Sequence, residues 1–145
     1  MDEPRQIKLG DIFYISLTQE DDVTPKNGMD HRYKYCFVVG FSEYGFYVAY
    51  FLMNSQVNQR YINTHDLLSC QYPLSHKDYP AIIIPEKDPS YLDLGHVREI
   101  EESRLLKNGK HVGSLTQADH RNIFEWLRDS ELYSTKQKRR YGWCE

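Results

Sequence analysis

Two adjacent apolar segments constrain the fold of this chain more than any other feature of its sequence. Residues 33–41 read YKYCFVVGF and residues 46–53 read FYVAYFLM. Both segments are rich in the aromatic and β-branched residues that strands favour. The linker between them, SEYG, ends in a glycine at position 45 that suits a tight turn. We therefore expect a β-hairpin at the centre of a sheet.

Weaker strand signals lie on both sides of this hairpin. Apolar residues alternate with polar ones after the Gly10-Asp11 turn, which predicts a first strand that ends near Leu17. Residues 18–32 are polar and contain a proline and an Asn-Gly pair, so we expect a long loop there. Further strands are predicted at residues 59–63, 79–84 and 95–100.

The clearest helix signal comes late in the chain. Thr116 is a good N-cap residue, and apolar residues follow it at helical spacing. We expect a helix from about Gln117 to Ser130. Several short strands with one late helix, and no alternating strand–helix units, predict a mainly β fold: a small β-barrel closed by a C-terminal helix, or a packed pair of sheets.

The last residues are basic and aromatic. Residues 134–145 contain a run of lysines and arginines together with Tyr141 and Trp143, a segment too short and too charged to form a core. We expect one domain over residues 1–133 and a tail outside it. The tail is either an exposed segment that aids solubility or a nucleic-acid-binding segment, whose basic residues contact phosphates and whose Tyr141 or Trp143 stacks on a base.

Composition limits the functions that are open to the chain. The net charge of −3 gives the molecule as a whole no attraction to nucleic acid, so any such site must be a local patch. Three separated cysteines without a C-x-x-C pair favour reduced thiols over a disulfide framework or a zinc site. No signal-like or membrane-spanning apolar run is present, so we expect a soluble cytoplasmic protein.

The order of motifs resembles that of the MazF/PemK/Kid toxin family. Residues 10–12, GDI, match the glycine, acid and β-branched residue with which this family opens its first strand. Residues 34–39, KYCFVV, correspond to its second strand, and Asn54-Ser55 to the Thr-Ser pair that ends the third. Residues 95–98, GHVR, and 112–115, VGSL, correspond to its arginine segment and to the glycine turn before the last helix.

This resemblance implies an SH3-like barrel that acts as a toxin in a toxin–antitoxin pair. The implied activity is metal-independent cleavage of single-stranded RNA by a homodimer, without a cofactor, which an antitoxin protein silences by lying in the RNA groove. The implied catalytic residues are Lys34, Ser55, His96 and Arg98, and the implied substrate-binding residues are Arg32 and Asn54.

The residues themselves suit that chemistry. RNA cleavage needs a group that removes the 2′-hydroxyl proton, a proton for the leaving oxygen, and cations for the phosphorane. An imidazole such as that of His96 has an ordinary pKa of about 6.5. Two residues later, Arg98 would face the same side of a strand and offers a planar fork to two phosphate oxygens. Lys34 supplies a further positive charge, and Arg32 would take its place if the second strand began a residue or two earlier or later. The Ser55 hydroxyl can donate a hydrogen bond to a phosphate or a base edge.

A binding function is the alternative reading of the same residues. Lysine stands where the family has Arg-Pro, asparagine where it has threonine, and Gly95 where it has an acid. These departures favour a barrel that has lost cleavage and binds a peptide or a nucleic acid. A further reading is that Lys34 and Arg98 are simply solvated side chains at the rim of the barrel.

Overall fold

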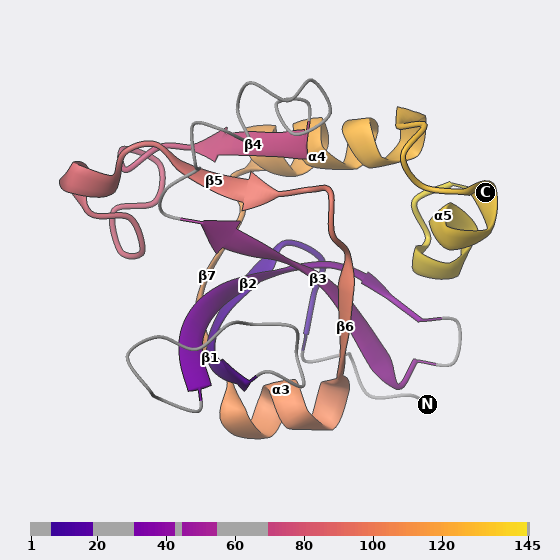
Figure 1. The fold of residues 1–145 in the computed structure, drawn as a ribbon, viewed down its shortest axis with the longest axis horizontal. Coiled ribbons are helices and arrows are strands. Elements are labelled where there is room, and N and C mark those ends of the chain that lie inside the picture. The colour runs from indigo at the N-terminus through magenta and orange to yellow at the C-terminus, as the bar shows by residue number, and fades with distance from the viewer. Residues whose placement is uncertain (1–6, 19–30, 43–44, 55–69, 145) are drawn as a thin grey trace.

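The structure is a computed structural model that describes residues 7–18, 31–42, 45–54 and 70–144 (Figure 1). In these parts of the chain, seven strands form one curled antiparallel sheet and three α-helices lie around it (Figure 1). The strands are β1 (Asp11–Thr18), β2 (His31–Phe41), β3 (Tyr47–Asn54), β4 (Gln71–Leu74), β5 (Ser90–Asp93), β6 (Arg98–Glu101) and β7 (Lys110–Ser114). The helices are α3 (Glu102–Asn108), α4 (Gln117–Asp129) and α5 (Thr135–Tyr141), and a 3₁₀ turn, η2 (Pro85–Lys87), precedes β5.

Strand β3 is the centre of the sheet and explains its curl. The strand order is β4-β5-β3-β2-β1-β7, and β6 also pairs with β3. The first half of β3 pairs with β6, from Tyr47 opposite Glu101 to Tyr50 opposite Arg98. Its last residues pair with β5 instead, as Met53 does with Leu92. Because one edge of β3 is shared by two strands that lead in different directions, the sheet bends into a half-barrel (Figure 1).

Both faces of β3 are buried, which accounts for its unbroken apolar sequence. Val48, Tyr50 and Leu52 point into one core cluster, which includes Leu105 of α3. Ala49, Phe51 and Met53 point into another, which includes Ile123 and Leu127 of α4 and Trp143 after α5. The helices therefore cover the sheet on both sides, and none of those that the structure describes is long and apolar enough to span a bilayer.

The main predictions from sequence pattern are confirmed. The fold is mainly β, the central hairpin is formed by β2 and β3, and β1 precedes it. Helix α4 runs over Gln117–Asp129 with Thr116 as its N-cap, whose hydroxyl accepts a hydrogen bond from the Asp119 N–H at 3.2 Å. The predicted end at Ser130 is one residue late, since Ser130 is the C-cap.

Other local predictions are wrong. Residues 79–84 form turns and irregular backbone rather than a strand. Pro80 has no N–H to donate to a neighbouring strand, and Ile83 is buried in the core without belonging to a strand. The strand predicted at residues 95–100 begins only at Arg98. Strands β4, β5 and β7 and helix α3 were not predicted. The strand predicted at residues 59–63 lies outside the described residues.

The predicted tail is part of the core. Ser134 and Gln137 form a capping box that begins α5, and Gly142, at φ 79°, ends it. The chain then places Trp143, only 5% exposed, against the sheet, where its indole N–H donates to the Val39 carbonyl at 2.8 Å. The expectation that this segment stays outside the core is wrong, because one large aromatic side chain anchors an otherwise charged helix.

Helix α4 is fixed to the sheet by a shared carboxylate. Asp119 accepts hydrogen bonds from the hydroxyls of Tyr72 and Tyr79, each at 2.5 Å. Burial and the hydrogen bond to Asp119 raise the pKa of Tyr79, and the same two causes raise the pKa of Tyr72. Both phenols are therefore held in their neutral, hydrogen-bond-donating form.

These raised pKa values predict a loss of stability in alkali. The contribution of neutral Tyr79 is complete below the unfolded phenol pKa of about 10 and is lost as the pH rises toward the higher folded pKa. Tyr141, whose pKa burial and Glu99 raise to about 12, adds to the same trend. The free energy of unfolding should fall above pH 10 or so, and tyrosinate absorbance should show a late-titrating group that Tyr79→Phe removes. If all tyrosines of the wild-type protein ionised around pH 10, as exposed phenols do, the raised pKa values would be contradicted.

Candidate functional site

The structure brings three of the predicted site residues together at one end of β2 and β3. The Lys34 ammonium donates to the Asn54 side-chain oxygen at 3.4 Å. This contact follows from the ladder, since each residue lies two positions beyond the pair of Cys36 and Leu52 in antiparallel register. Arg32 lines the same pocket as Lys34. Ser55, the next predicted residue, lies outside the described part of the chain.

Arg98 lies farther along the sheet. It pairs with Tyr50, four residues from Asn54 on β3, which corresponds to about 13 Å along the strand. Because Tyr50 and Asn54 are both at even positions of the same strand, Arg98 and Lys34 project from the same face. The structure therefore aligns these two cations along one face without placing them in contact.

His96 is not on a strand with Arg98, and that expectation is wrong. It lies in the turn between β5 and β6, and its side chain is 70% exposed. Its Nδ1 lies 3.2 Å from the Asp93 Oδ2, while the other Asp93 oxygen accepts from the Gly95 N–H at 3.0 Å. If Nδ1 carries the proton, Asp93 orients the ring and leaves Nε2 as a basic nitrogen at the surface.

A pocket of about 260 Å³ opens beside Lys34, and we name it the tyrosine pocket. Its volume is close to the lower end of the range found for small-molecule sites. The ends of β1 and β2 form one side of it, and residues 82–84 with η2 contribute to the other. The lining residues that carry rings or charges are Tyr14, Arg32, Tyr33, Lys34, Tyr35 and Lys87.

Three tyrosine rings pack against one another in this pocket. Tyr14 lies opposite Tyr35 in the β1–β2 ladder, and their ring centroids are 4.7 Å apart. Tyr14 also stacks on Tyr33, with centroids 5.1 Å apart and an interplanar angle of 16°. Tyr33 is 54% exposed, so one end of the stack faces solvent. Burial, and secondarily Tyr14, raise the pKa of Tyr35 and keep its ring neutral.

The charge of this pocket is opposite to that of the whole chain. Among the described residues, its lining includes Arg32, Lys34 and Lys87 and no aspartate or glutamate, whereas the complete sequence carries a net charge of −3. Strand alternation sends Arg32 and Lys34 to the face opposite Tyr33, so these cations lie at the rim of the aromatic stack. This is the local basic patch that a nucleic-acid site in an acidic protein requires.

Sequence reasoning missed the aromatic half of this site. It selected Arg32 and Lys34 but none of the tyrosines beside them. The signal was present, because Tyr33 and Tyr35 are two residues apart on a predicted strand and therefore share a face. The partner ring, Tyr14, and the cation of Lys87 come from distant parts of the chain and could not be placed without the sheet register.

Metal-ligating side chains are not grouped in the described part of the chain. No three residues among its histidines, cysteines, aspartates and glutamates come together as metal ligands would. Its cysteines, Cys36, Cys70 and Cys144, are not joined in disulfide bonds. The predicted metal-independent chemistry stays a prediction.

Comparisons with known proteins identify no family. No family model, no curated protein and no solved structure matches this chain.

Proposed function

We propose that this protein binds single-stranded RNA in the tyrosine pocket. The observation that supports this most is the combination, in one pocket, of three tyrosine rings with three cations, and no carboxylate among the lining residues that the structure describes. Proteins that bind single strands join a positive groove for the phosphates to aromatic rings on which bases stack. Tyr33 supplies the exposed ring and Arg32, Lys34 and Lys87 the charge.

Single strands fit this pocket better than duplexes do. A duplex keeps its base faces stacked inside the helix, whereas an unpaired base can turn its face toward a tyrosine ring. RNA is favoured over DNA by the resemblance to MazF and PemK toxins, whose substrate is single-stranded RNA. A DNA strand of the same sequence is therefore an informative comparison in every binding experiment.

The exposed ring gives the first prediction for binding. Tyr33→Ala should weaken the binding of a fluorescently labelled single-stranded RNA by about 5- to 150-fold, because stacking of one base contributes about 1–3 kcal/mol. Fluorescence anisotropy in excess EDTA measures this. Tyr47→Ala is a matched control, since Tyr47 is also a half-exposed strand tyrosine but lines a different pocket. Equal affinity of the Tyr33 variant and the wild type would refute the stacking role.

Cleavage of the bound RNA is a second candidate function. The observation that favours it is the alignment of Lys34, Asn54 and Arg98 on one face of the sheet, opposite the face that carries the Tyr33 ring. RNA bound at Tyr33 would have to pass around the Arg32 and Lys34 end of β2 to reach them. In this reaction the 2′-oxygen attacks phosphorus and the bond to the 5′-oxygen breaks, which leaves a 2′,3′-cyclic phosphate and a 5′-hydroxyl. A base takes the 2′ proton, and an acid protonates the leaving oxygen.

The residues have separable roles in this candidate. His96, oriented by Asp93, is the proton carrier; Lys34 and Arg98 neutralise the phosphorane, and Arg32 and Asn54 bind the strand. The protein would then be a MazF- or PemK-like toxin that acts as a homodimer. Its antitoxin would compete with RNA for the tyrosine pocket.

Cleavage has its own direct test. Purified protein is incubated with a long single-stranded RNA in excess EDTA, and Arg98→Ala and Lys34→Ala are run beside it. If the protein is a ribonuclease, the RNA is cut at discrete positions, and both variants lose at least about a hundredfold in rate, as removal of one oxyanion-stabilising group does in other enzymes. Intact RNA that is nevertheless bound excludes cleavage and retains the binding function.

A further inference from the structure

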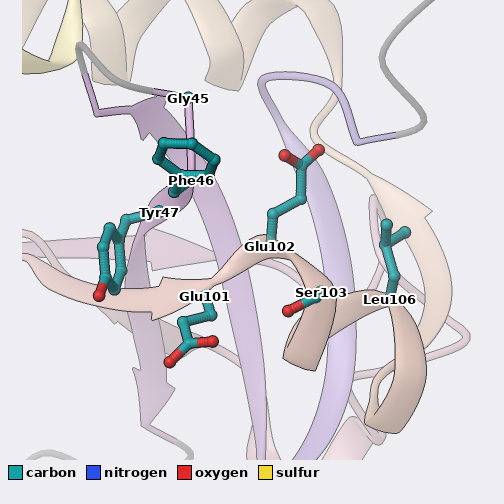
Figure 2. A pocket seen from close by; sticks show the side chains of 7 residues that line it. All are labelled: Gly45, Phe46, Tyr47, Glu101, Glu102, Ser103 and Leu106. Carbon is teal, nitrogen blue, oxygen red and sulfur yellow. The ribbon is translucent and has the colours of Figure 1, made fainter.

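A larger pocket lies away from the tyrosine pocket, where the start of β3 meets the junction of β6 and α3. Its volume is about 570 Å³, within the range of ligand sites. Phe46 and Tyr47 come from the start of β3, and Glu101, Glu102 and Leu106 come from the end of β6 and from α3 (Figure 2). We name it the Phe46 pocket.

The backbone around this pocket is held in place. The Glu102 N–H donates to the Phe46 carbonyl at 2.9 Å and joins the start of β3 to the first residue of α3. Tyr47 lies opposite Glu101 in the β3–β6 ladder. Gly45, at φ 76°, makes the turn that leads into β3. A partner would therefore meet a surface whose shape is set before binding, which lowers the entropic cost of association.

Apolar side chains are unusually exposed here. Phe46 is 71% exposed, and Tyr47 and Leu106 are each 42% exposed. Scattered apolar residues are normal on a surface, but three around one pocket form the type of patch that marks interaction sites. Aromatic residues on a fixed backbone are also the usual anchors of protein interfaces.

The charge of the pocket selects the partner. In the part of the lining that the structure describes there are two carboxylates, those of Glu101 and Glu102, and no lysine, arginine or histidine. In Figure 2 the carboxylates point in opposite directions, and that of Glu102 lies between Phe46 and Leu106. We propose that the Phe46 pocket binds a basic peptide segment of a protein partner, with apolar side chains on Phe46 and Leu106 and lysine or arginine beside the two glutamates. Phosphates would be repelled here, so this partner and RNA occupy different surfaces.

The probe for this proposal is a short synthetic peptide in which lysine alternates with phenylalanine and leucine. We expect it to shift the amide NMR signals of Phe46, Tyr47 and Glu101 in the complete, ¹⁵N-labelled chain. Phe46→Ala should weaken binding about thirtyfold, as the loss of an anchoring aromatic residue does. Glu101→Lys should also weaken peptide binding, and the loss should grow as the salt concentration is lowered, because the repulsion between the new lysine and the lysines of the peptide is then less screened.

Matched controls separate the possible outcomes. The same peptide with glutamate in place of lysine should not bind, and Leu132→Ala with Glu131→Gln, an exposed apolar and acidic pair elsewhere, should bind like the wild type. Shifts outside the Phe46 pocket, or equal binding of the acidic peptide, would overturn the proposal. Self-association of the chain that Phe46→Ala abolishes would overturn it in favour of a second copy as the occupant. Loss of RNA binding in Tyr33→Ala leaves this proposal untouched.

Discussion

Trp143→Ala should lower the free energy of unfolding by about 3–5 kcal/mol, the range found for truncating a buried tryptophan or phenylalanine. Trp143 is only 5% exposed, and its ring lies 5.2 Å from that of Tyr133 and 6.3 Å from that of Phe51. Alanine would leave a cavity between α5 and the sheet and would remove the donor to the Val39 carbonyl. Because small domains are stable by about 5–15 kcal/mol in total, this one change would remove a large share.

Urea unfolding followed by far-ultraviolet circular dichroism measures this loss without depending on tryptophan fluorescence. Trp143→Phe separates the two contributions, since it keeps most of the ring volume but leaves the Val39 carbonyl without its donor, at a cost of about 1–3 kcal/mol. Leu132→Ala is the surface control and should stay within about 0.5 kcal/mol of the wild type. A Trp143→Ala protein as stable as the wild type would mean that α5 is not part of the folded domain.

The position of Trp143 shows where sequence reasoning was limited. The charge of residues 134–145 argued for an exposed tail, but local signals for a helix were also present: Ser134 and Gln137 at capping-box spacing, and Gly142 at a helix end. These signals predict that a helix forms. They do not predict that Trp143, just after this helix, packs on the core, because that depends on the face that β2 and β3 form together in the assembled sheet.

The same distinction explains the strands. The central hairpin was predictable because β2 and β3 are long and apolar and joined by a short turn, so their pairing is local in the sequence. Strands β4 and β5 have four residues each, and β4 finds its partner in a segment nearly twenty residues later. Such strands have weak patterns of their own and depend on non-local pairing. Residues 79–84 looked like a strand because buried turns and buried strands share an apolar composition.

The candidate site divides in the same way. Lys34 and Asn54 could be placed together because they face each other across the predicted hairpin. The positions of His96 and Arg98 relative to each other could not be predicted, because they share a strand only if β6 begins at or before His96. Strand β6 begins at Arg98. The stack of Tyr14 on Tyr33 depends on the β1–β2 register, which the long intervening loop does not fix.

The cations of the tyrosine pocket should control RNA affinity and its salt dependence together. Each phosphate contact with a single strand contributes about 0.7 to the slope of log affinity against log salt, so Arg32→Gln, Lys34→Gln and Lys87→Gln combined should reduce that slope by about 2. Because this contribution vanishes near 1 M salt, the triple variant should bind about 400-fold more weakly at roughly 50 mM salt. Anisotropy titrations with one RNA over a series of salt concentrations give both quantities.

A second triple variant tests whether position or total charge matters. Lys107→Gln, Arg121→Gln and Lys136→Gln change the net charge by the same amount at exposed residues outside the tyrosine pocket. If phosphates bind at the pocket, this control keeps the wild-type slope. Equal loss in both variants would show that RNA responds only to net charge, and the pocket would lose its proposed role. A reduced slope in the pocket variant alone, together with the loss in Tyr33→Ala, would place both the phosphates and a stacked base at the end of β1 and β2, because charge and stacking are removed there by independent changes.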